Sequence, residues 1–233
     1  MFQFKQFAIQ QEHAALKVCT DSCLFAALAP CETAAHILDI GTGTGLLALM
    51  LAQKCSAEID AVEIDAGAVK DATTNFENAP WQQRLYLFHL PIQEYVKHCT
   101  KTYDFIIANP PFYAAQLLSP EASRNAALHS TQLSFQDLLM AIQALLSDTG
   151  HFFVLLPPIE AKIFASKALE LGFGMQEAIR VKNNANGKVI RKIMLFAKTA
   201  SSPEEEREIV IRDEKGSYSE AFVALLKPYY LYL

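Results

Sequence analysis

The sequence has too few cysteines, too widely scattered, to build a disulfide-stabilised or zinc-binding domain. It contains five, at positions 19, 23, 31, 55 and 99. An odd count without paired spacing indicates reduced, partly buried thiols. Cys19 and Cys23 would share a helix face with His13 upstream, but no second pair completes a set of four ligands. We therefore expect no metal site.

The chain also lacks a long apolar run and a leader-like beginning. No segment is apolar for long enough to span a bilayer. Met1–Lys5 does not have the charge-then-apolar order of a signal peptide. With 52% hydrophobic and 19% charged residues, the composition is that of a globular protein. These absences predict a cytoplasmic protein without a membrane partner, and we expect it to be a monomer.

A surplus of positive charge is absent as well, because the net charge is −5. That balance argues against nucleic-acid binding without sequence preference. The exception is the stretch 180–192, which carries five basic residues and no acid. Its candidates for contact with RNA are Lys182, Lys188, Arg191 and Lys192, and the competing interpretation is a solvated hairpin.

What the chain does have is a regular alternation of strand-like and helix-like segments. Predicted strands cover 36–40, 57–65, 84–89, 103–108, 151–156, 176–182 and 189–197, and predicted helices cover 23–29, 46–52, 69–76, 92–98, 135–146 and 160–171. The alternation predicts an α/β fold with a doubly wound, mostly parallel sheet of seven strands whose last strand is antiparallel. We expect one domain over 1–233, with an N-terminal extension or lid (1–35), a core (36–200) and a C-terminal extension (201–233).

The segment 36–52 joins a strand, a glycine-rich turn and a helix. The turn, Gly41–Gly45, reads Gly-Thr-Gly-Thr-Gly, and glycines let a backbone approach a ligand closely. Glu63 lies at the end of the next predicted strand, 22 residues after Gly41. A carboxylate at that spacing can accept hydrogen bonds from both hydroxyls of a ribose. The segment therefore predicts a nucleotide-type cofactor.

The glycine spacing separates two classes of cofactor. Dinucleotide enzymes use Gly-x-Gly-x-x-Gly, which aims a helix N-terminus at a pyrophosphate. Here Leu46 occupies the position of the third glycine, and Asp39 precedes the turn, where it would repel a pyrophosphate but can face an ammonium group. S-adenosylmethionine (SAM) has an ammonium, a ribose and no phosphate. We therefore predict SAM, with S-adenosylhomocysteine as product, ahead of NAD.

Asn109, Pro110, Pro111 and Phe112 follow the apolar run 103–108, which is typical of a buried parallel strand. The side-chain carbonyl of Asn109 and the backbone carbonyl of Pro110 can accept both hydrogens of an NH2 group, while Phe112 stacks on its ring. Bonds that draw both protons out of plane free the nitrogen lone pair in the transition state. These four residues are the candidate catalytic residues, and the competing interpretation is a Pro-Pro turn that only ends a strand.

Taken together, these residues resemble class I SAM-dependent methyltransferases of the amine-methylating type. More narrowly, the chain is similar to the bacterial adenine N6-methyltransferases that modify valine tRNA at the adenine beside the anticodon. The matching segments are Phe4–Phe7, Lys17–Asp21, Asp39–Gln53, Asp60–Glu63, Pro80-Trp81, Asn109–Phe112, Tyr218–Ala221 and Tyr229-Tyr230. With the residues discussed above, the resemblance implies cofactor contacts from Thr20, Asp21, Asp39, Gly41, Thr42, Gly43, Gly45, Glu63, Ile64, Pro91 and Asn109.

The chain departs from the family at three positions. Cys19 stands where the family often has glycine. Pro91 lies where an acidic residue usually holds the SAM adenine, so backbone groups would have to hold that base. Ala127-Leu128-His129 replaces a common Ala-Arg pair, which leaves Arg124 and His129 as the nearby candidates for RNA contact, beside Phe112.

The resemblance implies SAM-dependent N6-methylation of an adenine in a tRNA anticodon loop, at position 37 of tRNA-Val. The two acceptors of Asn109 and Pro110, with the ring of Phe112, form a cup for an amino group (the Asn109 cup). This cup cannot by itself distinguish adenine N6 from other amino groups. An N-methyltransferase acting on a protein glutamine amide or an rRNA base amine is therefore the alternative function. A SAM-binding protein without turnover and an NAD oxidoreductase are further alternatives.

Overall fold

The computed structural model describes residues 1–110, 133–199 and 205–233, so Pro111, Phe112, Arg124 and His129 lie outside the described residues. The strands are β1 (Phe2–Gln3), β2 (Ala8–Ile9), β3 (His36–Ile40), β4 (Glu58–Glu63), β5 (Leu85–His89), β6 (Tyr103–Ala108), β7 (Leu146–Leu156), β8 (Gly174–Asn184), β9 (Val189–Ala197) and β10 (Glu205–Arg212). The helices are α1 (Thr20–Leu28), α2 (Leu46–Lys54), α3 (Ala66–Glu77), α4 (Ile92–His98), α6 (Phe135–Leu145), α7 (Pro158–Glu170) and α8 (Glu220–Leu226).

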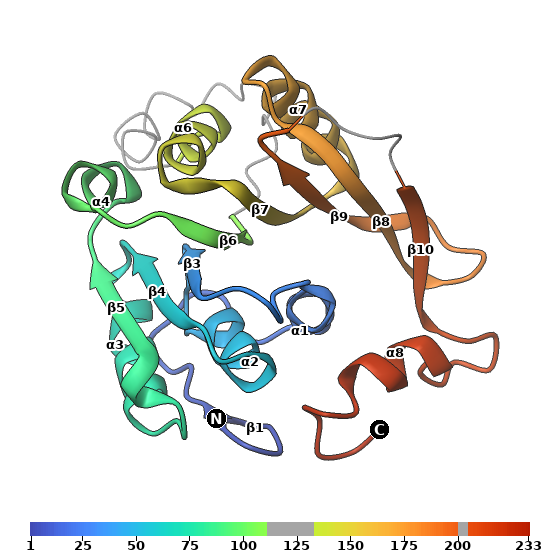
Figure 1. Cartoon of the computed structure of the whole chain (residues 1–233). Helices are drawn as coiled ribbons and strands as arrows, with labels where there is room; N and C mark the ends of the chain where they lie inside the picture. Colours follow the sequence, from blue (N-terminus) through green and yellow to red (C-terminus); the bar gives the residue numbers. More distant parts are fainter. Residues whose placement is uncertain (111–132, 200–204) are drawn as a thin grey trace, which may run out of the picture.

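The predicted doubly wound, mostly parallel sheet is confirmed, with one strand more than expected. Eight strands lie in the order β10-β8-β9-β7-β6-β3-β4-β5 (Figure 1). Only β9 runs against its neighbours, and it lies between β7 and β8. The additional strand, β10, comes from the segment expected to be an extension and pairs in parallel with β8. The sequence did not indicate this strand because an edge strand needs few apolar residues, and among residues 206–212 of β10 only Ile209 and Ile211 are buried.

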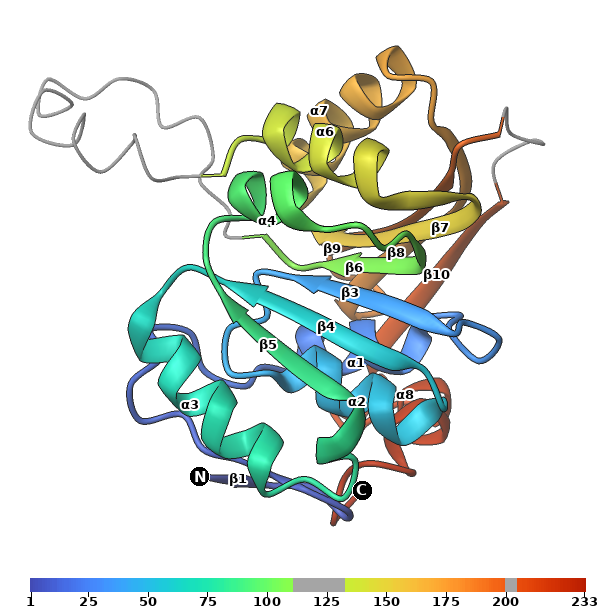
Figure 2. The same ribbon diagram turned by 60° about the vertical axis from the view of Figure 1, so that its left-hand side comes forward.

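Helices cover both faces of the sheet (Figure 2). One buried cluster joins the sheet to α1, α2 and α8 and includes Phe25, Leu47 and Phe222. The other joins the opposite face to α4, α6 and α7 and includes Leu139 and Phe164. Because the central strands are buried from both sides, their sequences are nearly continuous apolar runs rather than alternating ones.

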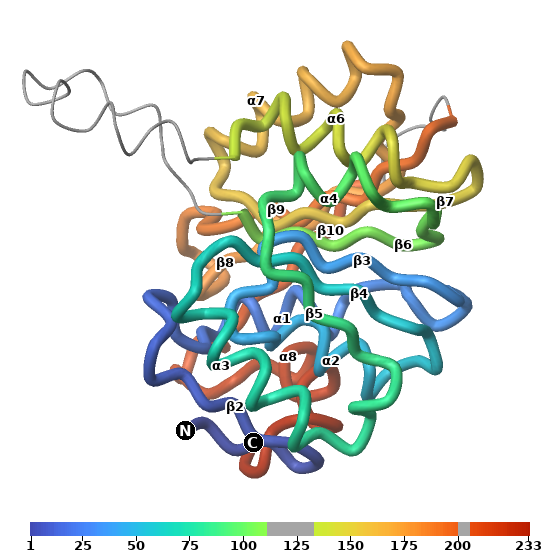
Figure 3. Tube along the Cα trace, turned by 90° about the vertical axis from the view of Figure 1, so that its left-hand side faces the viewer, coloured from blue at the N-terminus to red at the C-terminus, as the bar shows by residue number. Residues whose placement is uncertain are grey.

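The first residues of the chain pack against the last ones (Figure 3). Phe4 forms an isolated β-bridge with Tyr230, and the Lys5 amide donates to the Tyr229 carbonyl at 2.8 Å. Phe4 also stacks on Phe7, with ring centroids 4.5 Å apart. These contacts fix the β1–β2 hairpin. From there the chain runs past α3 toward the carboxyl edge of the sheet.

Candidate active site

Three polar segments meet where neighbouring parallel strands end. Ile40 of β3 pairs with Val62 of β4 on one side and with Ala108 of β6 on the other. The turn Gly41–Gly45 and Asn109 follow β3 and β6, and Glu63 is the last residue of β4, so all three lie at one edge of the sheet. In sheets of this kind, ligands bind at that edge.

The glycine turn adopts a backbone that favours glycine and leaves open space beside it. Gly41, Gly43 and Gly45 have φ values of +73°, +59° and +82°. A Cβ atom on Gly41 or Gly43 would meet no atom within 4 Å, whereas one on Gly45 would lie 2.4 Å from Cε1 of Phe76. Gly45 thus permits close packing against α3, while the other two glycines border space that a ligand can enter.

Glu63 is held rigidly beside this turn. Its Oε2 accepts from the Gly43 amide at 2.8 Å, and its Oε1 accepts from the amides of Ile64 and Asp65 at 2.8 and 2.9 Å. A carboxylate oxygen accepts about two hydrogen bonds, so Oε1 is filled by its two amides, whereas Oε2 has one acceptor position left. The next side chain, Ile64, is 49% exposed directly after the buried strand β4. A carboxylate and an apolar surface thus lie side by side.

Asp39 is a buried carboxylate with unfilled hydrogen-bonding capacity. Its Oδ2 accepts from the Thr42 hydroxyl at 2.6 Å, and its Oδ1 is buried without a hydrogen-bond partner among the described residues. Burial raises the pKa of Asp39 to about 7. Since a buried ionised carboxylate needs a compensating charge, the site fits a cationic group of a ligand.

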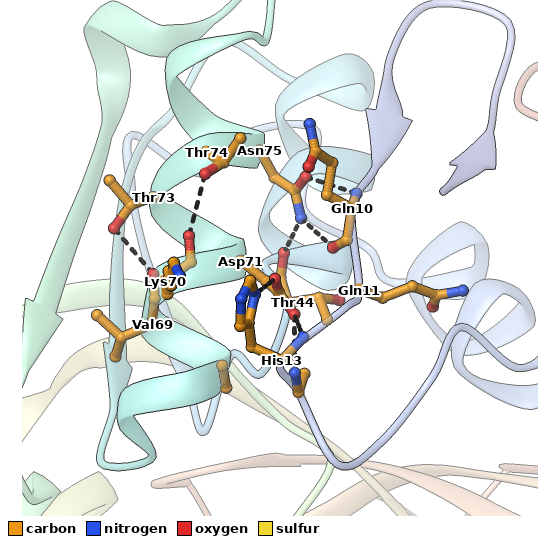
Figure 4. Close-up of polar contacts among 12 residues, drawn as sticks. Gln10, Gln11, His13, Thr44, Val69, Lys70, Asp71, Thr73, Thr74 and Asn75 are labelled. Carbon is orange, nitrogen blue, oxygen red and sulfur yellow. Dashed lines mark hydrogen bonds and ion pairs between the residues drawn. The ribbon is translucent and has the colours of Figure 1, made fainter.

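Helix α3 joins the N-terminal segment to the glycine turn (Figure 4). The Asn75 amide donates to the carbonyls of Thr44 and Gln10, at 2.8 and 2.9 Å. Asp71 accepts from the backbone amides of His13 and Ala14 at 2.9 and 2.8 Å, and it pairs with the His13 ring at 2.7 Å. The segment around residues 10–14 therefore has a fixed position beside the turn.

Asn109 lies against helix α1, and this contact orients its amide. Its Nδ2 donates to the Ser22 hydroxyl at 3.0 Å, while its Oδ1 is buried without a hydrogen-bond partner among the described residues. Ser22 also lies 2.9 Å from the Cys19 thiol. The sequence did not indicate Ser22, because the contact joins residues 87 positions apart. Pro110 is buried next to Asn109.

The predicted RNA-binding lysines and arginine do not form one open basic surface. Lys182 pairs with Glu208 at 3.0 Å and Lys192 pairs with Glu206 at 3.6 Å, both on the unpredicted strand β10. Two further candidates are placed differently: Arg191 pairs with Asp21 of α1 at 2.8 Å, and Lys188 is exposed in the β8–β9 turn. The acids that balance the stretch come from outside it, so its own composition did not reveal them.

The remaining predicted cofactor residues lie on either side of the turn. Thr20 and Asp21 begin α1 and line a cavity shared with β8, β9 and β10. Pro91 precedes α4, and its carbonyl accepts from the amides of Glu94 and Tyr95. Within the described ranges, no helix is long and apolar enough to cross a membrane, and no cluster of three or more His, Cys, Asp or Glu side chains is arranged to hold a metal ion.

Comparison with known proteins identifies this arrangement as that of a methyltransferase. The Methyltransferase small domain family matches residues 17–183. The structure also resembles that of a predicted O-methyltransferase from Agrobacterium tumefaciens, with a TM-score of 0.70 at 16% identity over 89% of this chain and 95% of that one. This likeness shows a shared fold.

Two relatives define the narrower family. A tRNA1(Val) (adenine(37)-N6)-methyltransferase from Cytophaga hutchinsonii is 42% identical over 100% of this chain and 98% of its own length. A protein of the same name from Dyadobacter fermentans is 43% identical over 99% of this chain and 97% of its own length. The chain belongs to the tRNA1(Val) (adenine(37)-N6)-methyltransferase family.

Proposed function

We propose that this protein transfers a methyl group from SAM to N6 of an adenine in a tRNA anticodon loop, at position 37 of tRNA-Val. The observation that supports this most strongly is the buried Oδ1 of Asn109, which has no hydrogen-bond partner among the described residues and lies at the sheet edge that carries the glycine turn. An acceptor of this kind suits the amino group of an adenine. The relatives' names indicate the same reaction.

The residues around the glycine turn fit SAM as the methyl donor. Asp39 would hold the ammonium group with its unfilled Oδ1, and Glu63 would accept from a ribose hydroxyl through Oε2 while it fixes Gly43. Ile64, with Pro91 nearby along the edge, would cover one face of the cofactor's adenine. When bound, SAM supplies an electrophilic methyl group to this edge of the sheet.

The protein's own contribution to the reaction is to hold and activate the amine. Asn109 Oδ1 and the Pro110 carbonyl would each accept one N6 hydrogen, which disfavours delocalisation of the nitrogen lone pair into the ring. Phe112 would stack on the base, an interaction that any base can make, so selection for an amine falls to the two carbonyls. The product nitrogen can lose its extra proton to water, so we assign no general base.

A tRNA substrate suits this site because an anticodon-loop base is not paired in a duplex. Extruding such a base costs less than flipping one from a helix. Among the predicted RNA-binding residues of the β8–β9 hairpin, we assign a phosphate contact to Lys188, which is exposed in the turn. The other three basic residues already have acidic partners. We propose that residues 1–233 act as one methyltransferase domain.

The direct test uses purified protein, radiolabelled SAM and an unmodified tRNA-Val transcript. The matched control is the same transcript with guanine at position 37. We expect label only in the adenine-containing transcript, recovered as N6-methyladenosine after nuclease digestion. Equal labelling of both transcripts would place the methyl group elsewhere, and no labelling with fresh enzyme and SAM would contradict the assigned reaction.

A further inference from the structure

The cavity lined by Thr20 and Asp21 lies at the same edge of the sheet, on the opposite side of Asn109 from the glycine turn. Its volume is about 270 Å³. Its lining residues come from the start of α1, from β8, β9 and β10, and from the turn before α8: Thr20, Asp21, Asn183, Ile190, Ile211, Arg212 and Tyr218. Thr20 and Asp21, which the family resemblance implies as cofactor contacts, line this cavity instead of the space beside the glycine turn. The strand residues take no part in the methyl-transfer site described above.

The sheet order places this cavity on the substrate side of Asn109. Strands β3, β4 and β5 lie on one side of β6 and carry the glycine turn and Glu63, whereas β7, β9, β8 and β10 lie on the other. Strands β8 and β10 run in the direction of β7, so Asn184 and Arg212, where they end, lie at the same edge as Asn109. Figure 1 shows β10 and α8 on this side of α1.

Residues 20–22 connect the cavity to Asn109, the proposed amine-binding residue. Thr20 and Asp21 line the cavity, and the next residue, Ser22, accepts the hydrogen bond from Asn109. An RNA strand whose adenine occupies the Asn109 cup must continue away from the cofactor. The half of the edge with β8 and β10 is where its neighbouring nucleotides can lie.

The lining of the cavity has the chemistry of a base-stacking site. The Arg212 guanidinium lies over the Tyr218 ring, 4.7 Å from its centroid, and Phe222 stacks on the same ring with centroids 4.5 Å apart. Arg212 is exposed, so the face open to a base is that of its guanidinium. Ile190 and Ile211 supply apolar walls, and the Asn183 amide offers both a donor and an acceptor. Asp21 is neutralised by its ion pair with Arg191, so it does not repel a nearby phosphate.

We propose that this cavity binds the base of a nucleotide adjacent to the target adenine, stacked on the exposed face of the Arg212 guanidinium, whose other face lies on Tyr218. The inference rests on the proposed function, since it names where the same RNA continues. Extruding one base removes stacking from its neighbours, and a planar cation over an aromatic ring replaces that stacking. The volume is smaller than the ~300–1,000 Å³ of sites for drug-sized ligands, which suits a single base.

The test combines a protein variant with a missing base. Substrates are synthetic anticodon stem-loops of tRNA-Val: one intact, and two with an abasic site immediately 5′ or 3′ of the target adenine. Wild-type protein is compared with Arg212→Gln and with Lys215→Gln, which removes a nearby exposed charge outside the cavity lining. Asn183→Ala serves as a second cavity variant, because Arg212 also donates to the Gly216 carbonyl and its loss can loosen that turn.

We expect Arg212→Gln to raise KM for the intact stem-loop about tenfold, the lower part of the range for one stacked base. The affinity for S-adenosylhomocysteine should stay unchanged, and Lys215→Gln should stay within about twofold of wild type. With wild-type protein, one of the two abasic substrates should show a KM raised by a similar factor over that of the intact stem-loop. With Arg212→Gln, that same abasic substrate should show no further rise in KM. That absence of additivity identifies the missing base as the partner of Arg212.

Two results would overturn the inference. One is an unchanged KM in both Arg212→Gln and Asn183→Ala. The other is a rise in KM from the abasic site that is as large in Arg212→Gln as in wild type. Such independent effects would assign Arg212 to a phosphate and the base to another site. Failure of wild-type protein to methylate the intact stem-loop or a full tRNA-Val transcript would instead contradict the proposed function.

Discussion

Binding of the cofactor should become tighter as pH rises through the neutral range, because of Asp39. Burial raises the pKa of its carboxyl to about 7 in the free protein. A bound ammonium group favours the charged form and lowers that pKa, so the complex holds fewer protons than the free protein. By linkage, affinity then increases with pH up to the pKa of the free protein and levels off above it.

The size of the effect follows from the fraction of Asp39 that is charged. With a pKa of about 7, about one tenth of the carboxyl groups are ionised at pH 6 and about half at pH 7. Affinity should therefore rise about fivefold between these values, and by about tenfold per unit below pH 6. The ammonium keeps its charge over this window, because α-amino groups titrate near ~7.7–8.0.

Isothermal titration calorimetry with S-adenosylhomocysteine measures this directly, since the product keeps the ammonium and ribose and is not consumed. Titrations at pH 6 in two buffers of different ionisation enthalpy should show release of about 0.9 proton per ligand bound. Asp39→Asn, which preserves shape, should bind more weakly and lose both the pH slope and the proton release. Equal affinity at pH 6 and pH 7 with wild type, or an unaltered slope with Asp39→Asn, would refute the assigned contact.

Four further substitutions test the site. Asn109→Ala should leave S-adenosylhomocysteine affinity within about twofold and lower kcat by about 10²-fold or more; equal loss of binding and turnover would contradict its assigned role. Ser22→Ala should lower kcat without changing cofactor affinity, and Ser22→Thr should restore it, because only the hydroxyl orients the Asn109 amide; failure of threonine to rescue would show a packing role instead. Glu63→Ala should weaken cofactor binding measured by calorimetry, since it removes the ribose acceptor and the Gly43 contact together; an unchanged dissociation constant would show that the contact is misplaced. Gly45→Ala should lower the free energy of unfolding by about 2 kcal/mol or more, from a φ of +82° and a collision with Phe76; an unchanged urea midpoint would argue against that packing.

Much of the central sheet could be predicted from the sequence because its buried parallel strands are continuous apolar runs. Helix α4 and strands β3, β6 and β9 have the predicted boundaries. β10 was not predicted, since an edge strand that begins with charged residues has the composition of a loop. Its omission also affected the interpretation of the basic stretch, because Glu206 and Glu208 neutralise Arg180, Lys182 and Lys192.

The parts of the candidate site that depend on local sequence could be predicted, whereas the parts that depend on long-range contacts could not. Asp39 and Glu63 lie at the ends of β3 and β4, and the glycine turn and Asn109 directly follow β3 and β6, so the topology of the fold fixes their common edge. Ser22 becomes relevant only when α1 packs beside β6. Similarly, the cavity at Arg212 exists only because β10 and α1 lie at the same edge, and no spacing in the sequence relates them.

The most direct test of the central claim is the nucleoside composition of tRNA-Val from cells that lack this gene. Mass spectrometry after nuclease digestion should show loss of N6-methyladenosine, its return with the wild-type gene, and no return with Asn109→Ala expressed at the same level. N6-methyladenosine that persists without the gene, or that returns with Asn109→Ala, would contradict an enzyme whose Asn109 carbonyl prepares the adenine amine for methylation.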